Sequence, residues 1–400
     1  MKSSTSLAGS TVGSTERDLE GRVFDVGGLR RRLSELADRR HPKGLRYELG
    51  SLLLLIVLAK LSREDLPVGI ADWVSFREDK LKRALGLTWP RMPHHETYRR
   101  ILGAVVDPEE FDQVVGRYLR ELPKVGWSVL VSFDGKTVRG TITKDNPRGE
   151  HLLAAYLPEE GIVLMQVSAL DKDSEINAAP LLLGQIDLRG KVVVGDALHT
   201  QRALSVQILE AKADYLWFAK ENQPTLRGDI EQVFEGSRDT VLGGSIGNDF
   251  ETCRTVEKGH GRLESRKLTV SSELKGHSDW PGLEQVFRLE RRRLEVRSGK
   301  EESEVVYGLT SLSREEASAE SLLHLSRAYW GIENGLHGRR DVTFGEDRTR
   351  LTRGKAGRVM ASINNLVIGL LRHAGHTNLA QARRRCNADL SLALSFLAAP

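Results

Sequence analysis

Residues 128–134, Ser-Val-Leu-Val-Ser-Phe-Asp, form an apolar run of β-type composition that ends at an acidic residue. Two further strand-like runs follow at His151–Leu157 and Ile162–Leu170, separated by the turn sequence Pro158-Glu159-Glu160-Gly161. Three consecutive strands joined in this way predict an antiparallel meander. Asp134 is expected to close its first strand.

The pattern then changes to alternating helices and strands. Residues Ser174–Ile186 and Thr200–Ala213 are typical of helices, and Lys191–Gly195 and Tyr215–Ala219 are typical of short buried strands. A strand–helix–strand order favours parallel pairing through crossover connections. Three antiparallel strands followed by such crossovers have the element order of a ribonuclease H-like fold, so we predict a mixed α/β fold of this type.

The segment from Glu221 to about Leu312 does not continue this alternation. It contains several strand-like runs, at Arg266–Ser271, Val286–Glu290 and Val305–Leu309. These runs predict a mainly β insertion. A further helix is predicted after it, because apolar residues recur at spacings of 3, 4, 3 and 4 in the set Leu322, Leu325, Tyr329, Ile332 and Leu336. Glu333 lies at the edge of this stripe.

The bulk composition excludes several protein classes. The 400 residues carry a formal charge of +4, with a pI near 9.0, which suits nucleic-acid binding without requiring it. Cys253 and Cys386 stand far apart, which excludes a disulfide scaffold and argues against structural zinc. The longest apolar stretch, Leu52–Leu61, is shorter than the ~20 residues of a membrane span, and the N-terminus has no signal pattern. We therefore predict a cytoplasmic protein with no membrane partner.

Three acidic residues stand where a predicted element ends or turns: Asp134, Asp196 and Glu333. Three carboxylates suffice to hold two Mg²⁺ or Mn²⁺ ions, about 3.5–4 Å apart, that stabilise the attacking and leaving oxygens in phosphoryl transfer. Taken alone, each acid is also explained as a strand-end turn residue or as half of a surface ion pair. Together, on this order of elements, they favour a catalytic metal site.

Basic residues gather around Glu333. From Arg327 to Arg358 there are eight Lys or Arg residues against four Asp or Glu residues. Among them Arg339 and Arg340 carry guanidinium groups, which suit phosphate oxygens. Trp330 is a candidate to stack on an unpaired base. The alternative for the basic residues is a solvated polar helix end and loop, and the alternative for Trp330 is a position in the hydrophobic core.

Around Asp134, Asp196 and Glu333, and in several further motifs, the sequence resembles the insertion-sequence DDE transposases of the ISAs type, the group that includes the H repeat-associated proteins. The resemblance extends from about residue 25 to 372 and rests on ordered motifs. These are Phe133-Asp134-Gly135-Lys136-Thr137-Val138-Arg139-Gly140, His151-Leu152-Leu153-Ala154-Ala155-Tyr156, Ser174-Glu175-Ile176-Asn177, Gly195-Asp196-Ala197, Ala219-Lys220-Glu221-Asn222-Gln223, His260-Gly261-Arg262-Leu263-Glu264-Ser265-Arg266, Trp330-Gly331-Ile332-Glu333-Asn334-Gly335-Leu336-His337 and Asp341-Val342-Thr343-Phe344-Gly345-Glu346-Asp347-Arg348. It implies that Asp134, Asp196 and Glu333 form a catalytic triad on a ribonuclease H-like core.

We therefore predict a DNA transposase that binds the terminal inverted repeats of its element, hydrolyses their 3′ ends with two Mg²⁺ or Mn²⁺ ions and joins them to target DNA. Double-stranded DNA is the expected partner, bound by at least a dimer. Lys136, His260 and Arg262 are further candidates for phosphate contacts. Two alternatives stay open: a catalytically inactive or domesticated DNA-binding relative, and a metal-dependent nuclease without strand transfer.

The predicted organisation has four parts. Residues 1–20, rich in Ser, Thr and Gly, are expected to be disordered. Residues 21–125 are expected to form an all-α N-terminal domain that helps to bind DNA ends. Residues 126–372 are expected to form the catalytic domain, with its β-rich insertion at about 221–312. Residues 373–400 are the C-terminal tail.

Overall fold

The computed structural model describes residues 16–17, 23–24, 27–236, 249–259 and 261–397. The chain divides into two compact units, the first made of residues 1–123 and 353–400 and the second of residues 124–352. Within the described residues, no helix is both long enough and apolar enough to cross a membrane. We refer to the two parts as unit 1 and unit 2.

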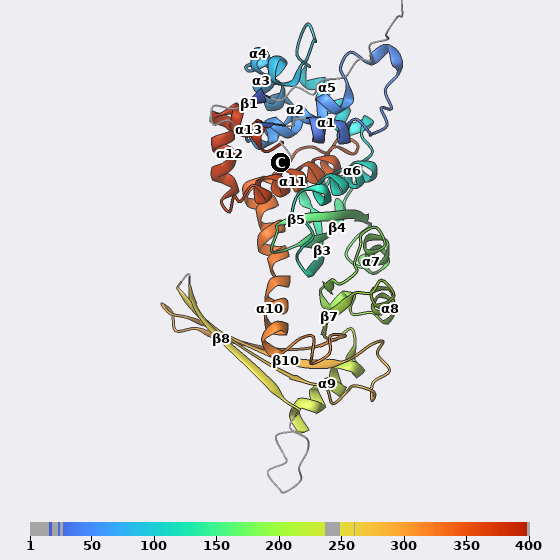
Figure 1. Ribbon diagram of the computed structural model, residues 1–400, viewed down its shortest axis with the longest axis vertical. Coiled ribbons are helices and arrows are strands. Elements are labelled where there is room, and N and C mark those ends of the chain that lie inside the picture. Colours follow the sequence, from blue (N-terminus) through green and yellow to red (C-terminus); the bar gives the residue numbers. More distant parts are fainter. Residues whose placement is uncertain (1–15, 18–22, 25–26, 237–248, 260, 398–400) are drawn as a thin grey trace, which may run out of the picture. The chain divides into compact units, whose positions relative to one another are not determined.

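Unit 1 is helical and combines both ends of the chain, drawn in blue and red in Figure 1. Its helices are α1 (Gly27–Leu33), α2 (Leu49–Leu61), α3 (Pro67–Ser75), α4 (Glu78–Leu85), α5 (His95–Arg100), α6 (Pro108–Glu121), α11 (Ala356–His373), α12 (Leu379–Ala388) and α13 (Leu390–Ser395). Two short strands, β1 (Glu16–Arg17) and β2 (Val23–Phe24), pair with each other. Helix α2 is buried on all sides, as its almost entirely apolar sequence predicts.

Ion pairs accompany the packing of the late helix α11 on the N-terminal helices. Arg358 Nη1 is 2.7 Å from Asp112 Oδ2 on α6, and both side chains are buried. Lys355 Nζ is 3.1 Å from Asp107 Oδ2, the residue that caps α6. The sequence-based division instead assigned residues up to 372 to the catalytic domain and treated 373–400 as a tail. The assignment of functions to these parts stays a prediction.

In the described part of unit 2, all strands belong to one nine-stranded sheet, in the order β5-β4-β3-β6-β7-β11-β10-β9-β8. The strands are β3 (Leu130–Val138), β4 (Glu150–Leu157), β5 (Ile162–Ala169), β6 (Val192–Val194), β7 (Asp214–Ala219), β8 (Glu251–Gly259), β9 (Arg262–Ser271), β10 (Gln285–Glu295) and β11 (Glu301–Thr310). Strands β3, β4 and β5 are antiparallel, whereas β6 is parallel to both β3 and β7. This order and these directions confirm the predicted ribonuclease H-like core.

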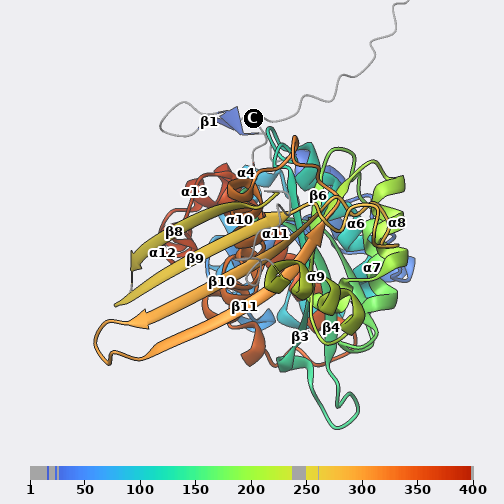
Figure 2. The same cartoon turned by 90° about the horizontal axis from the view of Figure 1, so that it is seen from below.

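The predicted β insertion is present, but it continues the core sheet. Strand β11 pairs antiparallel with β7, from Tyr307 opposite Ala219 to Thr310 opposite Leu216. Without this pairing β7 would be an edge strand with unpaired backbone groups. Figure 2 shows the four long strands β8 to β11 side by side, with α9 (Pro224–Gly236) beside them. The sequence pattern did not reveal β8, because its side chains are mostly polar and largely exposed.

Three other helices pack on this sheet. Helices α7 (Glu175–Leu183) and α8 (Arg202–Glu210) cover the core strands, and their apolar residues join the main hydrophobic cluster around Phe133 and Trp217. Helix α10 (Ala319–Tyr329) contacts β3, β8 and β9. It is followed by the π-helical turns η5 (Glu333–His337) and η6 (Arg339–Thr343).

Candidate active site

Asp134 and Asp196 lie at matching positions on neighbouring parallel strands. The last residue pair of the β3–β6 ladder is Ser132 opposite Val194, and each aspartate lies two residues beyond it. Because parallel strands run in register, the two carboxylates project at the same edge of the sheet, where ligands of open α/β sheets bind. The prediction that β3 ends at Asp134 was wrong, since β3 continues to Val138 by pairing with β4. On its β6 side the pairing ends earlier, at Ser132.

Local structure orients the second aspartate. Asp196 precedes the short 3₁₀ helix η4 (Ala197–His199), and its Oδ1 accepts a hydrogen bond of 2.9 Å from the backbone N–H of Leu198. Lys172 Nζ lies 3.8 Å from the other oxygen, Oδ2. The preceding residue, Gly195, lets the end of β6 pack closely against Phe133, because a Cβ at position 195 would lie only 2.8 Å from the ring of Phe133.

The third acid, Glu333, begins the π-helical turn η5 and is exposed. Such turns occur frequently at functional sites, because the extra residue per turn re-aims side chains. His337, at the other end of the same turn, lies with its Nδ1 3.7 Å from Asp134 Oδ2. The turn therefore brings the segment that carries Glu333 to the edge of β3.

The electrostatics of Asp134 show that negative charge is concentrated here. Burial, followed by repulsion from Asp196 and Glu175, raises the pKa of Asp134 from 3.8 to about 7; Glu333 adds a smaller repulsion. His337 supplies no compensating charge, since burial, aided by Arg340 and Lys136, lowers its pKa to about 3. A bound cation would relieve this repulsion.

The three carboxylates are chemically suitable ligands for a divalent metal ion. Carboxylate oxygens are the ligands that Mg²⁺ prefers. The buried Nε2 of His337 has no hydrogen-bond partner among the described residues, so a buried polar atom beside the acids is left unsatisfied. Across the same described ranges, however, no three His, Cys, Asp or Glu side chains are grouped closely enough to hold a metal ion. The three acids are thus neighbours that would have to draw together around a cation.

A fourth carboxylate, Glu175, lies beneath this edge of the sheet. It begins α7, its side chain is 2% exposed, and it accepts hydrogen bonds from His151 Nε2 at 2.7 Å and His199 Nε2 at 3.1 Å. His151 Nδ1 is 2.7 Å from the hydroxyl of Thr137, which donates to it if Nε2 carries the proton. Burial raises the pKa of Glu175, but the hydrogen bonds from His151 and His199 outweigh it, and the pKa falls to about 2. Glu175 is therefore an ionised carboxylate that joins β4, α7 and η4.

Gly135 allows this carboxylate to lie against β3. A Cβ on Gly135 would overlap Oε1 of Glu175, whose position two histidines hold. We expect Gly135→Ala to lower the free energy of unfolding by about 1–3 kcal/mol through overpacking and to impair DNA cleavage. Thermal unfolding and a cleavage assay would measure both effects.

A matched glycine provides the control for that prediction. A Cβ added to Gly228, on α9, meets no atom within 4 Å. Gly228→Ala should be neutral or slightly stabilising. Equal behaviour of the two variants would contradict the role given to the contact between Gly135 and Glu175.

The other sequence candidates have different environments. Lys136 is buried, with its Nζ 2.7 Å from Asp341 Oδ1 and 3.1 Å from Asp347 Oδ1. Arg340 is fully buried and its Nη2 lies 2.7 Å from Glu346 Oε1. Both cations therefore have acidic partners inside the protein, and this placement does not support the predicted phosphate contacts.

The remaining candidates are less buried or are not described. Arg339 is half-buried on η6, near the acids in sequence. Arg262 and Trp330 lie in a groove formed by the insertion strands and α10. His260 lies outside the described residues, so its contact stays a prediction.

Sequence reasoning gave no role to Glu175, His151 or His199. His151 and Glu175 stand in quoted motifs, Glu175 at a helix start in Ser174-Glu175-Ile176-Asn177, and His199 follows Ala197 by two residues. The usable signal was an acidic residue at the start of an apolar helix. Only its burial between two histidines distinguishes it from an ordinary first-turn acid.

Comparison with known proteins assigns the family. A family model described as "Transposase DDE domain" matches residues 128–370, and one described as "DDE_Tnp_1-associated" matches residues 30–119. The chain therefore belongs to the DDE transposase family. As predicted, its relatives include the H repeat-associated group, which the sequence motifs indicated.

Individual relatives are similar over most of their length. "Putative transposase YncI" of Escherichia coli O157:H7 is 30% identical over 347 residues, covering 85% of this chain and 86% of that protein. "H repeat-associated putative transposase YhhI" of Escherichia coli strain K12 is 27% identical over 353 residues, covering 87% and 91%. A solved piggyBac transposase synaptic complex with hairpin DNA aligns with 93% of this chain and 78% of that chain, at 12% identity. Its TM-score of 0.41 is too low to support an inference.

Proposed function

We propose that this transposase binds the terminal inverted repeats of its element, cleaves their 3′ ends and joins them to target DNA. The observation that carries the proposal is the pairing of positions at the sheet edge. Asp134 and Asp196 both lie two residues beyond the Ser132–Val194 pair, and Glu333 acts electrostatically on Asp134. Three acids at one edge of a ribonuclease H-like sheet suit metal-dependent phosphoryl transfer.

Asp134, Asp196 and Glu333 would hold two Mg²⁺ or Mn²⁺ ions, which when bound stabilise the attacking and leaving oxygens of the phosphodiester. The chain itself orients the ligands. The backbone N–H of Leu198 holds the carboxylate of Asp196, and the Asp134 side chain is largely buried, 17% exposed, at the edge of the sheet. Glu333 is the exposed member of the three acids. The π-helical turn η5, which follows the end of α10, sets the direction of its side chain.

The proposed partner is double-stranded DNA, first at the element ends and then at the target. Joining two ends in one event requires two active sites, so we propose at least a dimer in the DNA complex. The chain's moderate positive charge, +4, supports attraction to DNA without fixing the site.

The test is a cleavage and strand-transfer assay on DNA that carries the repeats flanking the gene, with Mg²⁺ or with EDTA. We expect metal-dependent nicking and joining by the wild type, and a loss of roughly 10³-fold or more in Glu333→Gln, because several kcal/mol of transition-state stabilisation disappear. Glu320→Gln is the control, since Glu320 is an exposed glutamate in the first turn of α10.

The alternative outcomes are separate. Cleavage without joined product would indicate a metal-dependent nuclease. Binding without cleavage would indicate the inactive DNA-binding relative. Equal activity of wild type and Glu333→Gln would contradict the assignment of the third acid.

A further inference from the structure

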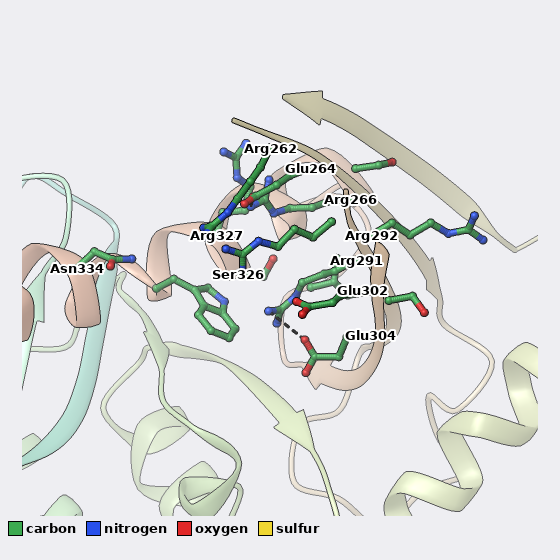
Figure 3. Close-up of a pocket in the computed structure, with 15 residues that line it drawn as sticks. Arg262, Glu264, Arg266, Arg291, Arg292, Glu302, Glu304, Ser326, Arg327 and Asn334 are labelled. Atoms are coloured by element: carbon green, nitrogen blue, oxygen red, sulfur yellow. Dashed lines mark hydrogen bonds and ion pairs between the residues drawn. The ribbon is translucent and has the colours of Figure 1, made fainter. Parts of the chain in front are cut away.

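A positively charged groove lies on unit 2 beside the segment that carries Glu333. It has a volume of about 730 Å³ and is lined by β9, β10, β11 and the end of α10 (Figure 3). Six arginines line it: Arg262, Arg266, Arg291, Arg292, Arg293 and Arg327. Arg292 alternates with Arg291 and Arg293 on β10, so its side chain projects away from the groove (Figure 3). Three acids, Glu264, Glu302 and Glu304, also line it, which leaves a formal excess of two positive charges on the groove face (5 − 3).

Two of these arginines face each other across neighbouring strands. Arg291 on β10 is directly opposite Arg266 on β9, and their side chains are 21% and 20% exposed. Like charges at directly opposed positions destabilise a sheet. Burial, and to a lesser extent the nearby Arg266, lowers the pKa of Arg291. The pair is thus an unfavourable arrangement that an anion between the two guanidinium groups would stabilise.

The acidic neighbours relieve only part of this repulsion. Arg291 Nη1 is 3.4 Å from Glu304 Oε2, and Glu304 is 54% exposed. Arg266 pairs with Glu264 on its own strand and, at 3.4 Å, with Glu257 on β8. Ion pairs with such solvated carboxylates contribute little, about 0–1 kcal/mol each, so the arginines remain available to a stronger anion.

The groove also adjoins the third acid. The guanidinium of Arg291 lies over the ring of Trp330, 4.1 Å from its centroid, and this contact holds the guanidinium plane in place. Trp330 and Asn334 both line the groove and stand on either side of Glu333 in the chain. An anion held by Arg291 therefore lies next to the segment that carries Glu333.

We propose that Arg266 and Arg291 bind a phosphodiester of one DNA strand in this groove, next to Glu333. The inference rests on the proposed function, which makes DNA the substrate. A volume of about 730 Å³ is in the range of single-ligand sites, roughly 300–1,000 Å³, so the groove accommodates a short piece of one DNA strand. Paired guanidinium groups match phosphate oxygens in charge and geometry.

The test is DNA binding in EDTA, which requires no cleavage, by wild type and Arg291→Gln over a series of salt concentrations. The probes are a duplex with the flanking repeats, an unrelated duplex and an unrelated single strand of equal length. We expect Arg291→Gln to lose roughly tenfold in affinity for all three and to reduce the salt slope by about 1, as for one lost phosphate contact. Arg291→Lys should keep the slope but recover only part of the affinity.

Arg254→Gln is the matched control. It removes the same charge from the same insertion. Arg254 on β8 lies opposite Lys267, whereas its neighbour Thr255 lies opposite Arg266, so the side chain of Arg254 points to the other face of the sheet. It should leave the salt slope unchanged. An unchanged slope in Arg291→Gln, or an equal reduction in Arg254→Gln, would overturn the groove proposal while DNA binding stands. A wild type that binds none of the probes would overturn the proposed function itself.

Discussion

Replacing Asp134 with Asn is expected to abolish DNA cleavage and at the same time to stabilise the metal-free protein. Cleavage should fall by roughly 10³-fold or more, because the shared metal ligand is lost. Stability should rise, because Asn removes a buried charge that Asp196, Glu175 and Glu333 repel. An opposite effect on activity and stability is typical of residues kept for function.

The pH dependence gives this prediction a direction. The folded pKa of Asp134, about 7, lies above its ordinary value of 3.8, so the folded state binds the proton more tightly than the unfolded state. The stability of the metal-free wild type should therefore fall as pH rises from about 4 through 7. The full penalty, up to about 4 kcal/mol at 1.4 kcal/mol per pKa unit, is present above pH 7.

The measurement is thermal unfolding of wild type and Asp134→Asn at pH 5 and pH 8, in EDTA and in Mg²⁺. In EDTA the variant should unfold several degrees higher than the wild type at pH 8, and the difference should shrink at pH 5. Mg²⁺ should raise the unfolding temperature of the wild type alone. Asp145→Asn, on an exposed loop, is the control. A variant that still cleaves, or one destabilised at pH 8, would contradict the role of Asp134.

Glu175→Gln is expected to have the second large effect, by removing the charge that joins three elements. Gln keeps the shape, but its amide group cannot accept the N–H groups of both His151 and His199. Removing one partner from a buried charged network costs about 3–5 kcal/mol, and we expect a loss near the lower end because the amide preserves one hydrogen bond. Cleavage should fall as well, because Gly135 and η4 carry the neighbouring aspartates.

The pH dependence of Glu175 runs opposite to that of Asp134. Its folded pKa, about 2, lies below the ordinary value of 4.5, so its contribution to stability is present above pH 4.5 and is lost as pH falls towards 2. The stability difference between wild type and Glu175→Gln should be largest at pH 7 and less than half as large at pH 3. Denaturant unfolding at the two pH values would measure it.

Glu210→Gln is the matched control, because Glu210 is an exposed residue at the end of the neighbouring helix α8. It should leave stability and cleavage unchanged. DNA binding should persist in Glu175→Gln, since the change does not touch the groove. A Glu175→Gln protein with wild-type stability and cleavage would show that the His151–Glu175–His199 contacts do not position the acids.

The element order and the candidate acids were predictable from the sequence because their signals are local. Apolar runs that lead into Asp134 or stop before Asp196, and a helical stripe that ends near Glu333, can be recognised within about ten residues each. Combining three antiparallel strands with two crossovers then restricts the fold strongly, because such connections have one preferred hand. The sheet order confirms that prediction.

Other features were decided only by tertiary structure, because they depend on residues far apart in the chain. The extension of the core sheet by β11 follows from the need to pair the edge of β7. The neighbours of Lys136 are aspartates more than 200 positions later, which local patterns cannot reveal. Opposed arginines on β9 and β10 likewise require a strand register.

By itself the sequence determined the fold class and the order of most elements, and it indicated the three candidate acids, since hydrophobic periodicity and the residues that follow an apolar run are properties of short segments. Tertiary structure decided which charges are buried and what they contact. It placed Glu175 between two histidines, buried Arg340 against Glu346 and opposed Arg266 to Arg291. The physical reason is that desolvation and charge pairing depend on distances in space, and the folded chain sets those distances only when remote segments pack together.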